Sequence, residues 1–258
     1  MRDPRHILIT GASSGIGAAL ALEYAAQGVL LSLHGRDAAR LQTLADQARA
    51  QGAEVVTHLG DVTNAPDLAA WIKERDTQAP IDLVIANAGI SGGTFGGSES
   101  DAQVRAIFSV NVDGVINTVQ PALALMTKRQ QGQIAIISSI ASFRGFPGAP
   151  AYCASKAAVR VYGEGLRGEA ARHGVEINVV CPGFIKTPMT DANPFPMPLM
   201  MEAARAARLI GDGLAANRAR IVFPFALYAA IRILTALPQP LIDFIAQKTP
   251  KKQASARS

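Results

Sequence analysis

The 258-residue sequence predicts an α/β fold, in which a doubly wound parallel sheet is covered by helices on both faces and the domain has three layers. Two observations predict it. Short, continuously apolar runs alternate with longer Ala-, Leu- and Gln-rich stretches of helical period, and a glycine-rich turn follows the first apolar run. Hydrophobic residues make up 49% of the chain, which suffices for one large core and excludes a mostly disordered chain. We expect one domain over residues 1–258.

Seven apolar runs, each bounded by turn residues, are predicted as strands, and the last of them has the weakest pattern. They cover residues 6–10, 30–34, 54–58, 83–86, 133–137, 176–180 and 220–223. The stretches between them have helical length and period, as in residues 15–27, 38–51 and 67–75. Strands that are apolar along their whole length are typical of a parallel sheet that is buried on both faces.

The composition excludes several classes of protein. Two cysteines and four scattered histidines exclude a disulfide scaffold and a cysteine-rich metal site, so no metal is expected. The net charge is +5, but no basic stripe lies beside aromatic stacking residues, so no nucleic-acid partner is expected. No secretory signal and no run of about 18 uncharged apolar residues are visible, which predicts a cytoplasmic protein without an ordinary transmembrane helix.

A glycine-rich loop joins the first predicted strand to the first predicted helix. Glycines at these positions permit a tight turn, close approach of the backbone and packing of the helix on the strand. The helix N-terminus then presents free N–H groups and a positive dipole end to a phosphate. A turn that merely needs glycines is the simpler alternative, but the position between strand and helix favours a dinucleotide site. The predicted contacts are Gly11, Ser13, Ser14, Gly15, Ile16 and Gly17.

The end of the second strand bears on the choice of cofactor. An acidic residue there suits the ribose hydroxyls of NAD, whereas a basic residue suits the 2′-phosphate of NADP. Arg36 is the basic candidate, Ser13 or Ser14 could add a hydroxyl, and Asp37 is most simply the N-cap of the next helix. We therefore expect NADP(H) in preference to NAD(H).

The third and fourth strands end at the same predicted edge of the sheet. Asp61 and Val62 follow the third strand, where a carboxylate could meet the adenine amino group, although a helix cap is the simpler role for Asp61. Asn87, Ala88 and Gly89 follow the fourth strand, where a ligand crevice opens and small residues permit close approach of a cofactor.

Tyr152 and Lys156 are four residues apart, so on a helix they lie on one face. A phenol has an ordinary pKa of about 10, and a nearby ammonium favours the phenolate and lowers that pKa. The pair could transfer a proton while a hydride moves to or from a nicotinamide, and the Ser139 hydroxyl could bind the substrate oxygen. A tyrosine and a lysine four residues apart occur often on helices by chance, so this spacing alone is a weak signal. Together with the glycine loop and Ser139, the pair predicts an oxidoreductase site.

The chain resembles the short-chain dehydrogenases/reductases. The matching pieces follow the family's order over roughly residues 5–190, and they are Thr10 to Gly17, Asp61, Asn87 to Gly89, Asn111, Ser139, Tyr152, Lys156 and Pro182 to Thr187. The resemblance implies a Rossmann fold and an NAD(P)-dependent interconversion of a carbonyl and an alcohol. It also implies a homodimer that forms through the long helices around residues 111–128 and 151–173.

The same resemblance implies individual roles. Tyr152 is the proton donor or acceptor, Ser139 orients the substrate oxygen, and Lys156 binds the ribose and tunes Tyr152. Asn111 matches the family's asparagine that holds a proton-relay water, whereas its own sequence context would indicate only a polar helix residue. Ser139 rather than Ser138 is the family's serine, because it lies thirteen residues before the tyrosine. The loop that contacts the nicotinamide carboxamide supplies Pro182, Gly183, Ile185 and Thr187.

The last quarter of the chain departs from the family's pattern. Residues 188–219 are expected to form a substrate lid, in which Phe195, Met197, Leu199 and Met200 line an apolar pocket. Residues 221–258 are expected to be an apolar and basic, helical C-terminal extension. Residues 201–258 carry nine Lys and Arg against three Asp and Glu. The extension has three open interpretations: packing on the chain's own core, a dimer interface, or peripheral contact with the inner face of an anionic membrane.

These features together predict an NADP(H)-dependent carbonyl reductase or alcohol dehydrogenase that acts on an apolar, lipid-like small molecule. Two alternatives stay open. One is a catalytically silent dinucleotide-binding sensor or scaffold, and the other is a peripheral membrane protein whose main task is attachment.

Overall fold

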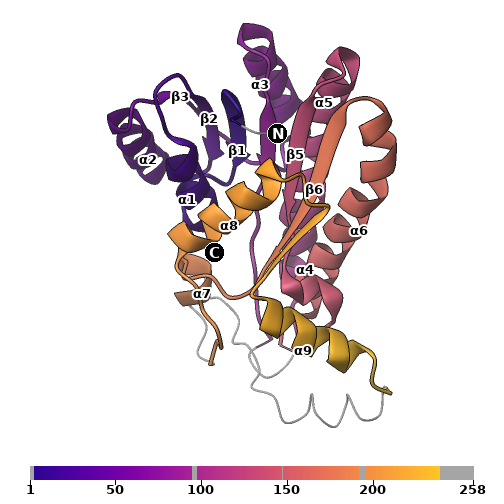
Figure 1. Ribbon diagram of the computed structural model, residues 1–258. Helices are drawn as coiled ribbons and strands as arrows, with labels where there is room; N and C mark the ends of the chain where they lie inside the picture. Colours follow the sequence, from indigo (N-terminus) through magenta and orange to yellow (C-terminus); the bar gives the residue numbers. More distant parts are fainter. Residues whose placement is uncertain (1–2, 95–97, 147, 192–195, 239–258) are drawn as a thin grey trace.

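The computed structural model describes residues 3–94, 98–146, 148–191 and 196–238. Seven strands form one parallel sheet in the order β3-β2-β1-β4-β5-β6-β7, which confirms the predicted doubly wound α/β fold (Figure 1). The strands are β1 (His6–Thr10), β2 (Leu30–Gly35), β3 (Glu54–Leu59), β4 (Leu83–Ala86), β5 (Gly132–Ile137), β6 (Val175–Pro182) and β7 (Arg220–Phe223). Three of them have the predicted bounds, and the others extend by one to three residues.

Helices cover both faces of the sheet, which gives the three predicted layers. One face carries α1 (Gly15–Tyr24), α2 (Ala38–Ala50) and α8 (Ala203–Ala215). The other carries α3 (Ala65–Gln78), α5 (Gly114–Arg129) and α6 (Pro150–Arg172). Shorter elements are α4 (Asp101–Phe108), a π-helical turn at Ser109–Asp113, a 3₁₀ turn at Ile140–Phe143, α7 (Pro188–Asp191) and α9 (Phe225–Thr235).

The core has two halves, one on each face of the sheet. Alternate residues of a strand point to opposite faces, so Ile7 and Ile9 of β1 pack under α1 and α2, whereas Leu8 packs under α3 and α5. All three residues are fully buried. The continuously apolar strands therefore serve two cores at once, which explains why their sequences do not alternate.

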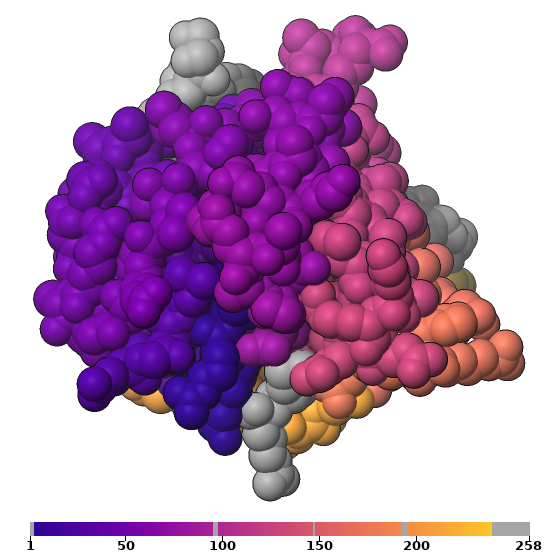
Figure 2. Space-filling view, turned by 90° about the horizontal axis from the view of Figure 1, so that it is seen from above, coloured from indigo at the N-terminus to yellow at the C-terminus, as the bar shows by residue number. Residues whose placement is uncertain are grey.

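The direction of winding reverses at β1, which pairs with both β2 and β4. The strands up to residue 59 thus build one side of the sheet, and those from residue 83 onward build the other. Figure 2 shows this division as indigo and purple residues on one side and pink to orange residues on the other. In such sheets a crevice opens at the carboxyl ends of the strands beside the point of reversal.

The segment after β6 is only in part what the sequence indicated. Helix α8, within the expected lid, packs against α1 and buries Ala206, Ala207, Ile210 and Leu214 in the core. Phe195 and residues 239–258, which include most of the basic tail, lie outside the described residues. Among the helices of the described part of the chain, none has the length and apolarity needed to cross a membrane.

Candidate active site

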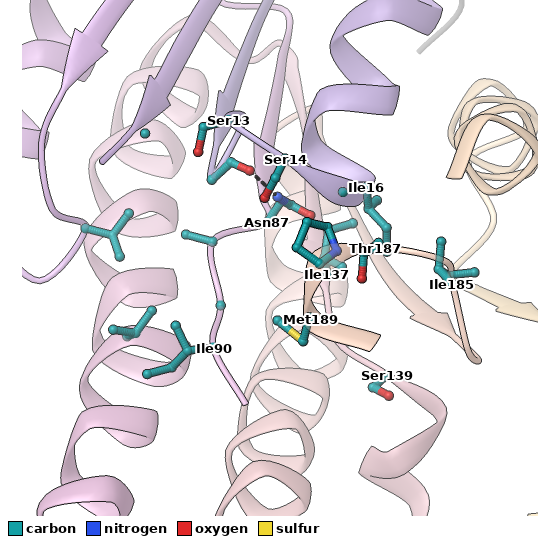
Figure 3. Close-up of a pocket in the computed structure, with 18 of the residues that line it drawn as sticks. Ser13, Ser14, Ile16, Asn87, Ile90, Ile137, Ser139, Ile185, Thr187 and Met189 are labelled. Carbon is teal, nitrogen blue, oxygen red and sulfur yellow. Dashed lines mark hydrogen bonds between the residues drawn. The ribbon is translucent and has the colours of Figure 1, made fainter. Parts of the chain in front are cut away.

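The turn between β1 and α1 folds tightly against the end of β4. Gly11 and Gly15 have φ angles of +65° and +59°, which favour glycine. A Cβ atom on Gly17 would lie 2.4 Å from the Gly11 carbonyl oxygen, so only glycine lets α1 start this close to the strand. The Asn87 side-chain amide donates hydrogen bonds of 3.0 Å to the carbonyls of Thr10 and Gly11, and it holds the turn from below (Figure 3).

The N-terminus of α1 is open toward this turn. Its N-cap residue is Ser14, whose side chain makes no capping hydrogen bond to the helix. The first N–H groups of a helix have no partner inside the helix and carry a positive partial charge. Such groups, in a cradle that excludes Cβ atoms, fit the pyrophosphate of a dinucleotide.

A cavity of about 490 Å³ extends from this turn along the carboxyl edge of the sheet (Figure 3). Most of the predicted site residues line it. These are Gly11, Ser13, Ser14, Gly15, Ile16, Arg36, Asp61, Val62, Asn87, Ala88, Gly89, Ser139, Tyr152, Lys156, Pro182, Gly183, Ile185 and Thr187. Two predicted residues, Gly17 and Asn111, lie behind the wall and support it.

Basic side chains flank the cavity at the end of β2. Arg36 lies 3.5 Å from the Asp61 carboxylate, and 63% of its side chain is exposed. Asp37 caps α2 by accepting a 3.0 Å hydrogen bond from the Arg40 backbone N–H, as the sequence predicts. Asp61 does not cap a helix, because Asn64 caps α3. Partial burial alone would raise the pKa of Asp61, but hydrogen bonds from Thr63 and the Arg36 charge hold that pKa below its usual range.

Tyr152 and Lys156 lie on the first turns of α6 and face the end of β5. The Lys156 Nζ donates a 2.9 Å hydrogen bond to the Ile137 carbonyl and lies 6.0 Å from the centre of the Tyr152 ring. Burial raises the pKa of Tyr152 to about 12, although its hydrogen bond with Ser139 acts in the opposite direction. Burial also lowers the pKa of Lys156 to about 8. Burial therefore dominates the pKa of Tyr152, and the neighbouring ammonium does not produce the lowering that the sequence predicts.

The two serines after β5 have different environments. The Ser138 hydroxyl donates a 2.8 Å hydrogen bond to the Lys156 carbonyl and is thus committed to α6. The Ser139 hydroxyl accepts a 3.1 Å hydrogen bond from the Ala141 N–H and keeps its own proton to donate. Both border the cavity, but Ser139 is the one that makes the hydrogen bond with Tyr152.

Asn111 is fully buried in the π-helical turn before α5. Its side-chain oxygen accepts a 2.7 Å hydrogen bond from the Ile90 N–H, and its amide donates to the Ile90 carbonyl and the Ser155 hydroxyl. A Cβ atom on Gly89 would lie 3.2 Å from both the Asn111 oxygen and the Lys156 Nζ. Asn111 thus fixes the backbone that follows β4 close to Lys156.

The loop after β6 forms the opposite wall of the cavity, and Figure 3 shows Ile185, Thr187 and Met189 on it. The Thr187 N–H donates a 2.9 Å hydrogen bond to the Thr190 hydroxyl, which itself donates to the Ile185 carbonyl over 2.7 Å. The Thr187 methyl group lies 3.0 Å from the position of a Cβ atom on Gly15. The loop therefore closes against the glycine turn.

Several lining residues were not predicted from the sequence. Most of them lie within two positions of a predicted residue in the chain, and this proximity is the one signal in the sequence that could have indicated them. They are His34, Gly35, Asp37, Arg40, Ile90, Val110, Ile137, Ser138, Pro188, Met189 and Thr190. Arg40 and Met189 add a second cation and a thioether to the two ends of the cavity.

Known proteins have a similar sequence and fold. The model of the short chain dehydrogenase family matches residues 5–195. The chain belongs to this family.

An uncharacterized oxidoreductase of Myxococcus xanthus is 40% identical over 95% of this chain and 97% of its own length. Two solved structures are each 27% identical to this chain. A short-chain dehydrogenase/reductase from Burkholderia phymatum in complex with NAD has a TM-score of 0.82 and covers 97% of this chain and 98% of its own. A short-chain dehydrogenase from Sphingobium yanoikuyae in complex with NADPH has a TM-score of 0.79 and covers 98% and 99%.

As a short-chain dehydrogenase, the protein is an NAD(P)-dependent oxidoreductase. The residues present fit such a cofactor, since the open N-terminus of α1 and the glycine cradle suit its phosphates. One end of the cavity has the cations Arg36 and Arg40, and the other has Ser139 and Tyr152.

Proposed function

We propose that the protein reduces a carbonyl group of an apolar small molecule, or oxidises the matching alcohol, with Tyr152 as the proton donor or acceptor. The observation that carries the proposal is the convergence of Tyr152, Ser139 and Lys156 on the cavity that begins at the glycine turn. The nicotinamide supplies or accepts the hydride. The protein's own residues hold the substrate oxygen and the proton.

The raised pKa of Tyr152 suits the role of a proton donor in carbonyl reduction. Tyr152 stays protonated at neutral pH because burial raises its pKa to about 12, so it can give its proton to a developing alkoxide. The Ser139 hydroxyl donates to the same oxygen as charge develops there. Lys156, anchored to the Ile137 carbonyl, stabilises the phenolate that Tyr152 leaves behind.

The test is the loss of NADPH absorbance with a panel of aldehydes, cyclic ketones and aromatic diketones. Tyr152→Phe is expected to lower turnover by roughly 100-fold or more while NADPH still binds. Phe225→Ala is the matched control, since that ring lies on exposed α9 outside the cavity. A wild-type protein that binds NADPH tightly and turns over no member of the panel would indicate a silent dinucleotide sensor instead.

We also propose that NADP(H) is preferred over NAD(H). Arg36 and Arg40 flank the end of β2, and Ser13 lines the same part of the cavity. The one acidic side chain of this turn, Asp37, is engaged by the N-terminus of α2 and by Arg40 at 3.2 Å. A phosphate between two guanidiniums gains charge-assisted hydrogen bonds that a ribose hydroxyl does not.

Arg36→Ala separates the two cofactors. It is expected to weaken NADPH binding roughly tenfold or more and to leave NADH binding nearly unchanged. Arg49→Ala, on the exposed surface of α2, is the control and changes neither affinity. Tighter binding of NADH than of NADPH by the wild-type protein would contradict the preference.

We propose further that α9 contacts an anionic membrane surface and that the enzyme takes its apolar substrates from that surface. Phe225 is 74% exposed and Ile233 is 66% exposed, although both are large apolar residues. Arg232 is exposed between them, and the sequence beyond the described residues adds Lys251 and Lys252. Exposed apolar side chains next to cations are typical of interfacial helices.

Sedimentation with vesicles tests this contact. The wild-type protein is expected to co-sediment with vesicles that contain phosphatidylserine and to a smaller extent with pure phosphatidylcholine. Phe225→Ser combined with Ile233→Ser is expected to abolish sedimentation without loss of NADPH binding. Equal sedimentation of the variant and the wild type would exclude α9 as the contact.

We propose in addition a homodimer through the outer faces of α5 and α6. Val161 on α6 and Ile116 on α5 are both exposed apolar residues. Chromatography with light scattering is expected to give a dimer for the wild type and a monomer for Val161→Glu. A monomeric wild type would overturn this proposal and leave the site unaffected.

A further inference from the structure

Phe143 ends the 3₁₀ turn that begins directly after Ser139, and charged and aromatic groups surround its ring. The guanidinium of Arg160 lies 4.8 Å from the ring centre, and that of Arg220 lies 5.4 Å from it. The ring of Tyr228 meets it edge-on, with 4.9 Å between the centres and a plane angle of 63°. These four residues come from the 3₁₀ turn, α6, β7 and α9. We call them the Phe143 cluster.

A single carboxylate, that of Glu164, pairs with both cations of the cluster. Glu164 accepts hydrogen bonds of 3.1 and 2.9 Å from Arg160 Nη1 and one of 2.9 Å from Arg220 Nε. Partial burial alone would raise the pKa of Glu164, but the two guanidiniums hold that pKa below its usual range. The ion pairs therefore persist at every pH at which the enzyme would be assayed. They fix both guanidiniums against the ring.

Helix α6 connects the cluster to the predicted catalytic residues. Tyr152, Lys156, Arg160 and Glu164 follow at intervals of four, so they form one stripe along the helix. Tyr152 bonds Ser139, Lys156 bonds the Ile137 carbonyl, and Arg160 stacks on Phe143. The chain from Ile137 to Phe143 is thus held at its start, middle and end.

Helix α9 contacts the same turn at a second point. A Cβ atom on Gly183 would meet Pro224 Cδ at 2.8 Å and both Ile140 Cδ1 and Leu227 Cδ2 at 3.4 Å. Ile140, the residue after Ser139, is therefore packed where the start of α9 and the loop after β6 converge. In Figure 1, α9 lies apart from the helices that cover the sheet and touches its carboxyl end.

We propose that Tyr228 is a positioning residue for the reaction, because its ring completes the Phe143 cluster and thereby fixes the turn that carries Ser139. The inference rests on the proposed carbonyl reduction. It assigns the C-terminal extension a part in the reaction from outside the cavity, because Tyr228 of α9 packs against the turn that follows Ser139. A displaced turn moves the Ser139 hydroxyl away from the substrate oxygen, and small displacements of this kind lower rates strongly.

Three variants of α9 test the inference with 1-phenyl-1,2-propanedione as the substrate probe. Tyr228→Ala is expected to lower kcat roughly tenfold, with the NADPH dissociation constant unchanged. Tyr228→Phe keeps the ring contact and is expected to restore kcat to within about twofold of the wild type. Ile233→Ala, an apolar truncation on the exposed side of the same helix, is expected to leave kcat unchanged but to weaken vesicle binding.

A double-mutant cycle distinguishes positioning from a general loss of structure. If Tyr228 acts through Ser139, Tyr228→Ala has almost no effect on kcat once Ser139→Ala is present. Equal fold losses in both backgrounds would overturn the inference. Should Tyr228→Ala not fold, Phe143→Leu replaces it in the same cycle, because it keeps apolar bulk and removes the π face. If the wild-type protein is inactive on every carbonyl tested, the proposed function is contradicted. If the wild type is active and Tyr228→Ala is equally active, this inference alone is contradicted.

Discussion

Glu99 accepts a 2.9 Å hydrogen bond from the backbone N–H of Ala151, which lies 52 residues later in the chain. This carboxylate caps α6, whose own N-cap residue Ala149 has no side chain that could do so. The wall that follows β4 is thereby joined to the helix that carries Tyr152, one residue after the capped N–H.

Loss of this cap destabilises the protein. Glu99→Ala is expected to lower the free energy of unfolding by about 1 kcal/mol, because a helix N–H loses its acceptor. Glu99→Gln retains a carbonyl acceptor and is expected to lose less than half of that. Urea unfolding measures both, with Glu169→Ala on the exposed side of α6 as the control. Equal losses for Glu99→Ala and Glu169→Ala would contradict the role of Glu99 as a cap.

The glycine turn tolerates no side chain at position 17. Gly17→Ala places a Cβ atom 2.4 Å from the Gly11 carbonyl oxygen and 2.6 Å from the Asn87 amide, so the turn or Asn87 must move. We expect NADPH affinity to fall roughly tenfold or more, measured by NADPH fluorescence. Gly168→Ala on α6 is the matched control, since nothing lies within 4 Å of its Cβ position. That control is expected to stabilise the helix by about 0.5–1 kcal/mol.

Acid destabilises the protein through a buried histidine. His34 is 1% exposed, and its ring nitrogens have no hydrogen-bond partner among the described residues. Burial, together with His58, lowers the pKa of His34 to about 4. The unfolded chain, with a pKa of about 6.5, therefore binds a proton at higher pH than the folded chain does. The contribution of neutral His34 to the free energy of unfolding is therefore complete above about pH 6.5. It falls by on the order of 3 kcal/mol as the pH drops to about 4.

Urea unfolding between pH 4 and pH 7 measures that slope. His34→Phe keeps an aromatic ring against His58 and Trp71 but cannot titrate, so its slope is expected to be shallower. Phe108→Leu replaces a partly exposed ring that cannot titrate and is expected to keep the wild-type slope. A His34→Phe slope equal to that of the wild type would assign the acid sensitivity to other groups.

Cofactor affinity is expected to depend on pH through Lys156. Burial lowers the pKa of this ammonium to about 8, so its charge is present below pH 8 and is lost as the pH rises through that value. NADPH, a polyanion, is expected to bind several-fold more weakly at pH 9.5 than at pH 7. Fluorescence titrations should show this change in the wild type and in Lys186→Met, but not in Lys156→Met. The same pH dependence in all three proteins would remove Lys156 from cofactor binding.

The fold was predictable because the physical signal was local. The alternation of buried strands and helices predicted all seven strands, and β1, β4 and β7 have the predicted bounds. The predicted site residues lie at strand ends, and parallel strands bring their ends to one edge. That rule placed Asp61 and Asn87 in the same cavity although they are far apart in the chain.

What sequence reasoning missed depends on contacts between distant segments. The Phe143 cluster draws on four elements, and nothing in the local sequence of Phe143 or Tyr228 indicates that they touch. The expected lid over 188–219 followed the Pro- and Met-rich composition near Met200. It overlooked the helical spacing of Ala206, Ile210 and Leu214, which buries α8 on α1. The effect of burial on Tyr152 likewise needs the structure, because the sequence shows the ammonium but not the desolvation.

Both cysteines are buried as thiols, Cys153 beside Tyr152 on α6 and Cys181 near the end of β6. Burial raises the pKa of Cys181 to about 11, so little reactive thiolate exists at neutral pH. An alkylating reagent can therefore modify either residue only when its segment opens. The native chain therefore contains two thiols that report local opening, Cys153 beside Tyr152 and Cys181 on the strand that pairs with β7. Mass spectrometry can follow the alkylation of each over time without an engineered cysteine.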